Sequence, residues 1–428
     1  MNVAVIGLGP VGIVIAAGLA HAGHRVLATD REASRVEALR DGRTPVVEPG
    51  LAARVAATVA AGALAAADTI AEAVSRAQVT LVCVGTPALP SGDADLAALA
   101  EACDAIGPAL RRDAPPLVVV RSTVPPGTTR TLVTPRLAAA SGLEAGRGFH
   151  VAVQPEFLRE GSALADADLP TKIVVGATDR AAHDAVVGLC APDLACIVIA
   201  TTPEAAELAK YADNAWHALK VVFANEIGAV ARSLGVDGDA LMADFVRDRA
   251  LNVSAAYLRP GAPFGGSCLV KDVGALGRQA AVSGVGVPLL EAILASNREH
   301  LARVVADVDD AASAVVGIVG LAFKSGTADL RDSPYLALAR TLAARQRTVL
   351  VWDERVPRDD PGCDPAWFAR SPAALAEAAG TIVVCHGSAD ALATIASNVT
   401  PRHVVVDLSG HERARFAHAR YRSAGWRP

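Results

Sequence analysis

The sequence predicts an α/β protein in which two parallel-sheet domains are joined by a long central helix. Short apolar runs, typical of parallel strands buried on both faces, alternate with helical segments near both ends of the chain. Between them, residues 202 to about 234 form a helical stretch without a Gly or Pro cluster. The first apolar run leads into a glycine-rich turn, and the later α/β region repeats the layout without a GxGxxG motif. We therefore expect two Rossmann-like domains.

The length, charge and cysteine pattern limit the class of protein. At roughly 150 residues per domain, the 428 residues suggest two or three domains. The net charge of -5 argues against a nucleic-acid-binding face, which would carry a basic patch. The seven scattered cysteines show no metal-ligand spacing, so we predict no metal site. Their odd number, without the spacing of a disulfide framework, is typical of a reducing compartment.

We expect neither a secretion signal nor a membrane span. A strand predicted to start at residue 2 leaves no room for a signal peptide. The Ala-rich run 51–67 contains Arg54 and is shorter than the roughly 20 strongly apolar residues of a membrane span. We predict a surface helix for this run, and a cytoplasmic protein without a membrane partner.

A dinucleotide-binding turn is predicted at the start of the chain. The apolar run 3–6 leads directly into Gly7-Leu8-Gly9-Pro10-Val11-Gly12, and a helical run follows over residues 13–21. A second predicted strand, 25–29, ends at Asp30. The glycines let a pyrophosphate approach the helix N-terminus, whose dipole favours an anion. Asp30 would accept hydrogen bonds from the adenosine ribose and repel a 2′-phosphate, so the motif favours NAD over NADP.

Polar residues follow three further predicted strands of the first domain. The strands span 78–84, 116–120 and 150–153, and the residues that follow them are Thr86, Thr123 and Glu160. Because ligands bind at the carboxyl ends of strands in an open parallel sheet, we expect these three residues at one crevice. The alternative for each is a turn or helix-capping residue.

A thiol followed by a cation and a carboxylate lies in the stretch 264–272. Cys268 comes after two glycines and before Lys271 and Asp272. The cation would favour the nucleophilic thiolate, and the carboxylate could act on a proton or on water. The alternative is an inert, buried cysteine.

Two further groups of polar residues extend this candidate site. Lys210, Asn214 and His217 recur on one stripe of the central helix, for which the alternative is a solvated polar face. In the second α/β region, with predicted strands at 314–321, 348–352, 381–385 and 403–407, Lys324 and Arg331 would suit a phosphorylated ligand. The alternative for these two residues is a surface loop with solvated charges.

Together these features predict oxidation of an alcohol through an aldehyde to an acid. A nicotinamide cofactor accepts hydride, and a cysteine can hold the aldehyde covalently between two oxidations. A binder without catalytic activity is one alternative. A two-electron 2-hydroxy-acid dehydrogenase is another, but it would leave Cys268 and Lys210 without a role.

Several motifs, in this order along nearly the whole chain, resemble the nucleotide-sugar dehydrogenase family, which oxidises UDP-glucose, GDP-mannose and related sugars at C6 with two NAD. They are Gly7-Leu8-Gly9-Pro10-Val11-Gly12, Gly85-Thr86-Pro87, Arg121-Ser122-Thr123-Val124, Pro155-Glu156-Phe157-Leu158-Arg159-Glu160, Phe264-Gly265-Gly266-Ser267-Cys268 and Lys271-Asp272. The GDP-mannose branch is most similar, through Asn214-Ala215-Trp216-His217-Ala218, Phe223-Ala224-Asn225-Glu226-Ile227-Gly228, Tyr257-Leu258-Arg259-Pro260-Gly261 and Asp329-Leu330-Arg331-Asp332-Ser333-Pro334.

This resemblance implies a role for each matching residue. Cys268 is implied as the nucleophile, Lys210 and Asn214 as oxyanion-stabilising donors, and Asp272, Thr123 and Glu160 as residues that position or activate water. The implied contacts to the sugar nucleotide are Glu160, Lys210, Asn214, His217, Asn225, Tyr257, Arg259, Gly265 and Lys324. The implied contacts to NAD are Gly7, Gly9, Val11, Gly12, Asp30, Arg35, Thr86, Thr123, Lys271 and Arg331.

The resemblance also implies an organisation and a reaction. We expect an NAD-binding Rossmann-like domain over 1–200, a helical central region carrying the catalytic cysteine over 201–305, and a nucleotide-sugar-binding α/β domain over 306–428. A homodimer through the central helix is expected. The favoured reaction is four-electron oxidation of GDP-mannose to GDP-mannuronate, with UDP-glucose or another UDP-sugar as the alternative substrate. Val270 replaces a usual Pro, and Ala256 replaces one of two usual tyrosines.

Overall fold

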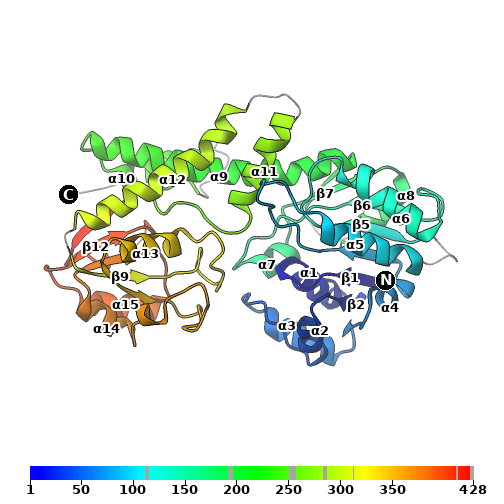
Figure 1. The fold of residues 1–428 in the computed structure, drawn as a ribbon, viewed down its shortest axis with the longest axis horizontal. Helices are drawn as coiled ribbons and strands as arrows, with labels where there is room; N and C mark the ends of the chain where they lie inside the picture. The colour runs from blue at the N-terminus through cyan, green and yellow to red at the C-terminus, as the bar shows by residue number, and fades with distance from the viewer. Residues whose placement is uncertain are drawn as a thin grey trace. The chain divides into compact units, whose positions relative to one another are not determined.

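The computed structural model describes residues 1–110, 115–190, 196–249, 257–282, 287–311, 313–410 and 413–424. It contains two compact units, Met1–Asp213 and Asn214–Pro428, each built around its own sheet (Figure 1). The predicted fold class is therefore confirmed. Ala256, which departs from the usual pattern of the GDP-mannose branch, lies outside the described residues.

The first unit contains an eight-stranded sheet with the order β3-β2-β1-β4-β5-β6-β7-β8. Its strands are β1 (Asn2–Ile6), β2 (Arg25–Thr29), β3 (Leu64–Ala66), β4 (Val79–Val82), β5 (Leu117–Val120), β6 (His150–Val153), β7 (Lys172–Ala177) and β8 (Ile197–Thr201). The first six strands pair in parallel, whereas β7 pairs antiparallel with β6 and parallel with β8. The carboxyl ends of β4, β5 and β6 therefore meet at one edge, as the sequence predicts.

Helices cover both faces of this sheet, because its central strands are apolar on both sides. The helices are α1 (Pro10–His21), α2 (Ala33–Arg40), α3 (Leu51–Ala60), α4 (Ile70–Ser75), α5 (Ala97–Ile106), η1 (Gly107–Ala109), η2 (Thr129–Val133), α6 (Thr134–Ser141), α7 (Ala163–Asp168) and α8 (Arg180–Leu189). Val3 and Val5 of β1 face a core formed with α1, α3 and α8, whereas Ala4 and Ile6 face a core formed with α4 to α6. This alternation explains the uninterrupted apolar run of the strand.

The predicted helix over residues 51–67 is wrong in its second half. The helix α3 ends at Ala60, and the strand β3 begins at Leu64. Gly62 has a φ of 67°, and its N–H donates to the carbonyl of Val59 (2.9 Å). A glycine in this left-handed conformation ends helices, so the chain turns and adds a strand to the edge of the sheet.

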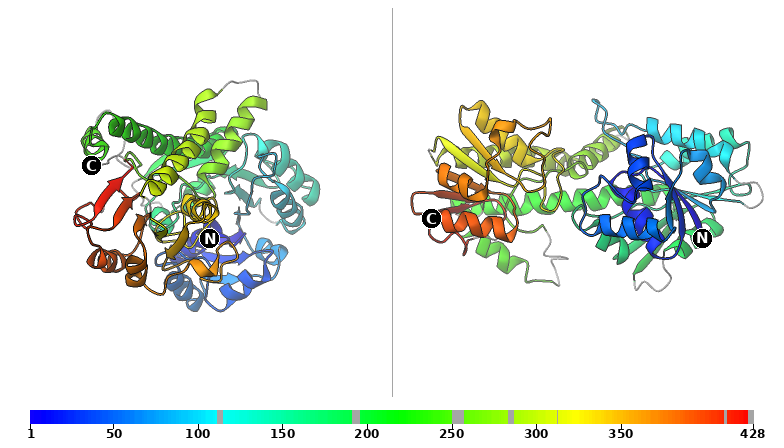
Figure 2. Two further views of the ribbon diagram at one scale, coloured as in Figure 1. Left: turned by 60° about the vertical axis from the view of Figure 1, so that its left-hand side comes forward. Right: turned by 90° about the horizontal axis from the view of Figure 1, so that it is seen from below.

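The long helix α9 (Pro203–Ser233) confirms the predicted central helix, and Figure 2 shows it in green as one unbroken helix. It begins in the first unit and ends in the second. Three more helices follow, namely α10 (Gly238–Phe245), α11 (Leu269–Val282) and α12 (Pro288–Asp309). In the described ranges, no helix is long and apolar enough to cross a membrane.

The second unit contains a five-stranded parallel sheet with the order β10-β9-β11-β12-β13. Its strands are β9 (Val315–Val319), β10 (Thr348–Trp352), β11 (Thr381–Val384), β12 (Val404–Asp407) and β13 (Arg420–Ser423). The helices that accompany it are α13 (Pro334–Ala344), η3 (Pro365–Trp367), α14 (Pro372–Ala378) and α15 (Ala389–Asn398). One face packs against α12 and α13, and the other against α14 and α15.

The two sheets share the same turn after their first strand. In the first unit, the N–H of Leu8 donates to the carboxylate of Asp30 at the end of β2 (2.6 Å). In the second, the N–H of Leu321 donates to Asp353 at the end of β10 (2.7 Å). Each turn begins with a glycine of positive φ, 102° at Gly7 and 89° at Gly320. The repeated layout predicted from the sequence therefore extends to hydrogen bonding.

Candidate active site

The glycine-rich turn between β1 and α1 leaves room for a ligand at a helix N-terminus. A Cβ at Gly7 would lie 2.7 Å from the carbonyl oxygen of Cys83, and one at Gly12 would overlap the carbonyl of Gly7. Gly9, by contrast, faces open space and begins α1 without a side-chain cap. The first N–H groups of α1 are thus left for another acceptor, which an anionic pyrophosphate provides. The turn therefore fits a dinucleotide.

Asp30, which the sequence predicts as a ribose contact, holds this turn. Its Oδ2 accepts from the N–H of Leu8 (2.6 Å) and from Arg35 (3.3 Å), while Oδ1 accepts from the N–H of Glu32 (2.9 Å). The carboxylate is largely buried, with 6% of the side chain exposed. Each carboxylate oxygen has two acceptor sites, so Oδ1 of Asp30 can still accept one hydrogen bond from a ribose hydroxyl. Val11 lies in the first turn of α1.

The structure brings together the polar ends of β4 and β5. The hydroxyl of Thr86 donates to the carbonyl oxygen of Thr123 (2.6 Å). The turn after Thr123 is held by Glu207 of α9, which accepts from the N–H groups of Gly127 (2.5 Å) and Thr129 (2.8 Å). Glu207 is buried, and this burial raises its pKa. The start of α9 is thereby fixed to the same strand end that carries Thr123.

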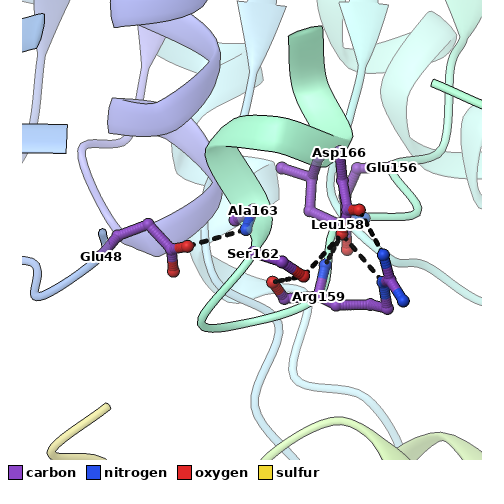
Figure 3. A network of polar contacts seen from close by, with 7 residues as sticks. All are labelled: Glu48, Glu156, Leu158, Arg159, Ser162, Ala163 and Asp166. Atoms are coloured by element: carbon purple, nitrogen blue, oxygen red, sulfur yellow. Dashed lines mark hydrogen bonds and ion pairs between the residues drawn. The ribbon is translucent and has the colours of Figure 1, made fainter. Parts of the chain in front are cut away.

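The turn after β6, which contains Glu160, is held by hydrogen bonds before and after this residue. Figure 3 shows the side chains that make them, among them Glu48, Arg159 and Asp166. Arg159 donates through Nε (3.0 Å) and Nη2 (2.6 Å) to the carboxylate of Asp166. Glu48 accepts from the N–H of Ala163 (2.8 Å). These bonds set the backbone around Glu160, which is half-buried at the carboxyl-terminal edge of the sheet.

A buried ion pair that the sequence does not reveal joins Glu156 to Lys210. The distance between Nζ of Lys210 and Oε1 of Glu156 is 2.9 Å, and the side chains are 5% and 8% exposed. The other carboxylate oxygen of Glu156 accepts from the N–H of Leu158 (2.6 Å). The Lys210 ammonium also lies 5.8 Å from the centre of the Phe157 ring. Glu156 is part of the motif 155–160, but the sequence predicts no role for it. Its contact with Lys210, 54 residues later in the chain, cannot be read from local sequence.

In the second unit, Cys268 lies at the N-terminus of α11. The N–H of Asp272 donates to the carbonyl oxygen of Cys268 (2.8 Å), so the cysteine directly precedes the first turn of the helix. An anionic sulfur at this position is stabilised by the helix dipole and by the N–H groups of that turn. Of the seven cysteines, all within the described ranges, Cys268 is the exposed one.

Five of the other cysteines suit packing rather than chemistry. Burial raises the pKa of the Cys83 and Cys103 thiols to about 12, and that of Cys363 to about 11. Burial likewise raises the pKa of Cys190 and, by far more, that of Cys385. Neutral thiols are poor nucleophiles. Accessibility and helix position therefore distinguish Cys268.

Asp272 is enclosed by two of the predicted site residues. The amide of Asn214 donates to its Oδ2, and the ammonium of Lys271 lies 2.5 Å from its Oδ1. The carboxylate is 1% exposed. Asn214 follows Lys210 by one turn of α9, and Asp272 fixes the orientation of its amide. Lys271, which is expected to contact the cofactor, forms an ion pair with Asp272 in the structure.

The departure at Val270 can be explained by its place in the helix. It is the second residue of α11, in the first turn, where backbone N–H groups have no partner within the helix. Proline is tolerated there because it lacks an N–H and has a suitable φ.

We expect Val270→Pro to leave the fold unchanged and to raise stability by about 0.4–1 kcal/mol, through a less flexible unfolded chain. Equilibrium denaturation of the purified variant measures this change. As a control, Val273→Pro places proline at a buried position outside that turn and should destabilise the protein strongly. A loss of stability in Val270→Pro as large as that of the control would contradict the assignment of Val270 to the first turn.

His217 on α9 lies beside an aromatic ring that also has a cation over it. The ring of His217 lies 5.4 Å from that of Tyr257, which has an unusual positive φ of 66°. The ammonium of Lys220 lies 5.2 Å from the centre of the Tyr257 ring and is buried. Lys220 was not among the predicted site residues, although it continues the stripe of Lys210, Asn214 and His217. A cation over a ring of this kind orients the ring.

The loop before Cys268 is packed closely against the second sheet domain. The N–H of Gly261 donates to Oδ1 of Asn225 (2.8 Å), which is buried. A Cβ at Gly265 would overlap the carbonyl oxygen of Asp332, and one at Gly266 would lie 2.6 Å from the Phe323 ring. The two glycines therefore serve close packing. The described hydrogen bonds of Asn225 are made to the backbone of this loop.

The cations predicted for a phosphorylated ligand lie around the turn after β9. Lys324 is half-buried, and Arg331 is exposed and forms an ion pair with Asp329 (2.5 Å). Arg259 is exposed in the loop that precedes Cys268. These three residues and Tyr257 belong to the second unit, whereas the glycine-rich turn belongs to the first. Among the residues with described positions, no three His, Cys, Asp or Glu side chains form a group that could hold a metal ion.

The fold and the glycine-rich turn define an α/β protein of the dinucleotide-binding class. Three domain models of the UDP-glucose/GDP-mannose dehydrogenase family match the chain. They are the NAD binding domain over residues 1–192, the central domain over 204–299 and the UDP binding domain over 317–411. The chain belongs to this family, and it is an NAD-dependent nucleotide-sugar 6-dehydrogenase.

Curated relatives and solved structures agree with this assignment. GDP-mannose 6-dehydrogenase of Pseudomonas putida is 41% identical over 357 residues, which are 83% of this chain and 81% of the relative. UDP-glucose 6-dehydrogenase AglM of Haloferax volcanii is 34% identical over 391 residues, 89% of this chain and 90% of the relative. A UDP-glucose dehydrogenase structure from Pyrobaculum islandicum superposes with a TM-score of 0.91 at 35% identity, covering 99% of this chain and 97% of the other.

The contacts of Asp30 lead to a prediction about the cofactor. We expect Asp30→Asn to raise the KM for NAD by about 10-fold to 100-fold, since a charged hydrogen bond contributes about 1.5–3 kcal/mol. The ratio of kcat/KM for NADP to that for NAD should rise as well, because the charge that repels a 2′-phosphate is gone. Steady-state kinetics with both cofactors measure this change.

The neighbouring Glu32 provides the control for this variant. It also pairs with Arg35 (3.3 Å), but its side chain is 51% exposed. Glu32→Gln should therefore change neither constant appreciably. Equal KM values for NAD in Asp30→Asn and the parent enzyme would refute a ribose contact at Asp30.

Proposed function

We propose that this enzyme carries out a four-electron oxidation of a nucleoside-diphosphate hexose at C6, with GDP-mannose as the favoured substrate and GDP-mannuronate as the product. The observation that carries the mechanism is the position of Cys268, an exposed thiol at the N-terminus of α11. Bound NAD supplies the oxidising power by accepting one hydride in each of two oxidations.

The proposed chemistry passes through two covalent intermediates on Cys268. In the first oxidation the C6 alcohol loses a hydride and its hydroxyl proton, which leaves an aldehyde. The Cys268 thiolate adds to the aldehyde carbon, and the resulting oxyanion takes up the proton released in the first oxidation, which gives a thiohemiacetal. Loss of the second hydride and of the hydroxyl proton leaves a thioester. Water then attacks the thioester carbon, the carbon–sulfur bond breaks, and the acid and the thiolate are released.

Lys210, Asn214 and Glu156 are proposed to support the charged species. Lys210 and Asn214 would donate hydrogen bonds to the oxyanions of the tetrahedral intermediates, as fixed donors do most effectively. The buried carboxylate of Glu156 would hold the ammonium of Lys210 in place through their ion pair (2.9 Å).

Thr123, Glu160 and Asp272 are proposed to position or activate water. Because Asp272 also contacts Asn214 and Lys271, we propose that it additionally orients these two side chains. The half-buried carboxylate of Glu160 follows β6 in a turn fixed on both sides, which suits it to hold water or the sugar.

The remaining assignments concern the ligands. We propose contacts to the sugar nucleotide from Glu160, Lys210, Asn214, His217, Tyr257, Arg259, Gly265 and Lys324, and from Asn225 through the loop that it holds. We propose contacts to NAD from Gly7, Gly9, Val11, Gly12, Asp30, Arg35, Thr86, Thr123, Lys271 and Arg331.

The choice of GDP-mannose rests on the curated relatives. GDP-mannose 6-dehydrogenases are about 41% identical to this chain, against 34% and 32% for UDP-glucose 6-dehydrogenases. UDP-glucose is the second candidate substrate, favoured by the TM-score of 0.91 with a UDP-glucose dehydrogenase structure. A binder without catalytic activity is the remaining alternative, and the presence of Cys268, Lys210, Asn214 and Asp272 argues against it.

A panel of nucleotide sugars tests the proposed function. NADH formation is followed with GDP-mannose, UDP-glucose and other UDP-sugars at equal concentrations, and the acid product is quantified. The proposal expects two NADH per sugar and the highest kcat/KM with GDP-mannose. A higher kcat/KM with a UDP-sugar would instead identify a UDP-sugar 6-dehydrogenase. No turnover with any nucleotide sugar would support a protein that binds nucleotide sugars without catalysis.

We also propose an organisation and an assembly. The proposed regions are an NAD-binding domain over 1–200, a central region over 201–305 and a nucleotide-sugar-binding domain over 306–428. All seven cysteines lie within the described ranges as thiols rather than disulfides, which supports a reducing, cytoplasmic setting. Trp216 and Phe223, seven residues apart on α9, are 48% and 39% exposed, which supports a homodimer through this helix. Light scattering that finds a monomer at micromolar concentration would exclude such a dimer.

A further inference from the structure

The loop over residues 261–264 is held by polar side chains from two helices. Asn297 of α12 makes two hydrogen bonds to the backbone of Phe264. Its Oδ1 accepts from the N–H (2.9 Å), and its Nδ2 donates to the carbonyl oxygen (2.8 Å). An amide that satisfies both groups of one residue fixes the position and the direction of the backbone there.

His300 lies one turn further along α12 and holds the same loop. Its Nε2 lies 2.7 Å from the carbonyl oxygen of Gly261, and the residue is buried. Because a carbonyl only accepts, the proton of the neutral ring must be on this nitrogen. Burial lowers the pKa of His300 to about 4, so the ring is neutral at neutral pH. The hydrogen bond is then independent of pH over the range in which dehydrogenases are assayed.

Asn225 of α9 completes the contacts from the opposite helix. It accepts from the N–H of Gly261 (2.8 Å) and donates to the carbonyl oxygen of Ala262 (3.2 Å). The Phe264 side chain is buried in a core that α9, α11 and α12 share. We call Asn225, Asn297 and His300 the loop clamp.

The chain needs such a clamp because two glycines separate the loop from the nucleophile. Gly265 and Gly266 have little conformational preference of their own, and Gly266 has a φ of 86°. Cys268 comes two residues later, at the N-terminus of α11. The direction in which the chain leaves Phe264 therefore sets where the sulfur lies. A nucleophile misplaced by about 1 Å can lose roughly 100-fold in rate.

We propose that Asn297 and His300, together with Asn225, are positioning residues that set the Cys268 sulfur for attack. They act through the backbone of residues 261–264, to which their described hydrogen bonds are made. This inference rests on the proposed role of Cys268 and adds two residues of α12 to the machinery of the reaction.

The test compares turnover with the chemical reactivity of Cys268. The variant Asn297→Leu removes both amide hydrogen bonds at similar volume. We expect its kcat with the best nucleotide sugar to fall by about 10-fold to 100-fold, while the KM stays within about threefold. The rate at which iodoacetamide alkylates Cys268, followed by mass spectrometry of its peptide, should change by severalfold. Thermal unfolding confirms that the variant is folded at the assay temperature.

Two comparisons separate positioning from general loss of stability. Asn398→Leu is the matched control, since Asn398 is a half-buried asparagine that bonds a carbonyl within its own helix α15 (2.8 Å). It should leave kcat and alkylation unchanged. His300→Gln keeps a donor for the Gly261 carbonyl, so its kcat should exceed that of His300→Leu by about 10-fold, the upper value of one hydrogen bond.

The outcomes of these measurements can contradict the clamp, and they can be told apart from a failure of the proposed function. If Asn297→Leu and His300→Leu keep the kcat and the alkylation rate of the control, the loop does not set the sulfur. If Asn297→Leu does not fold, Asn297→Asp removes the donor to the Phe264 carbonyl and is judged by the same two rates. If no nucleotide sugar is oxidised at all, the proposed function fails, and alkylation alone still decides on the clamp.

Discussion

We expect that replacing Cys268 with serine abolishes formation of the acid, while the protein stays folded and still binds NAD. A hydroxyl is a much weaker nucleophile than a thiolate, so the aldehyde is no longer captured between the two oxidations. We expect acid formation to fall by about three orders of magnitude or more, as for other nucleophile replacements. Serine is also a favoured residue at a helix N-terminus, which is where Cys268 lies. The variant should therefore be at least as stable as the parent.

The measurement is acid product per mole of enzyme, with NADH recorded alongside. Cys363→Ser is a suitable control, because Cys363 is a half-buried thiol outside the candidate site. It should retain activity. Binding of NAD to Cys268→Ser, followed by calorimetry, should match the parent, because the proposed dinucleotide contacts do not include the sulfur. Full acid formation by Cys268→Ser would remove the covalent mechanism.

Replacing Lys210 with methionine should lower both activity and stability. Loss of a donor to an oxyanion reduces kcat by about 10²–10³-fold. The substitution also leaves the Glu156 carboxylate buried without its cation, and breaking a buried pair costs about 3–5 kcal/mol. Both side chains are less than one-tenth exposed, which places the pair in this class. Activity assays and chemical denaturation of the same preparation measure the two effects.

A second substitution separates these two effects. In the double variant Lys210→Met and Glu156→Gln, the uncompensated charge is gone, so most of the lost stability should return. The activity should not return, because the oxyanion donor is still missing. Lys172→Met is the matched control, since Lys172 also lies over the Phe157 ring (4.4 Å) and pairs with Asp213 (2.7 Å). That pair is about 30% exposed, so its loss should cost about 1 kcal/mol or less.

If Lys210→Met keeps the parent kcat while losing stability, Lys210 has only a structural role. The opposite result, a loss of kcat without loss of stability, would show that water or a neighbouring group compensates Glu156. Both outcomes differ from the expected one and are read from the same two measurements.

Much of the fold could be predicted because it is encoded in short stretches of sequence. The strands β2, β6 and β10 have the predicted bounds, since each is a short apolar run that ends at a polar residue or a turn. The helix α9 also matches to within a residue or two at each end. The strands β7, β8 and β13 were not predicted. The Ile- and Val-rich sequences of β7 and β8 are typical of strands and could have been recognised. The strand β13 has four residues that alternate between exposed and more buried positions, which is a weak pattern.

The sequence by itself determined the class of fold, the dinucleotide turn, the neighbourhood of the candidate nucleophile and the family. All of these depend on residue types at fixed spacing, namely glycines that permit a close approach, an acidic residue after β2, and motifs in a set order. What only the tertiary structure decided is which charges and backbone groups meet. Lys210 meets Glu156, Asn214 meets Asp272, and Asn297 meets Phe264. These partners are between 33 and 58 residues apart in the chain, and folding alone brings them together, because local pattern carries no information on distant contacts.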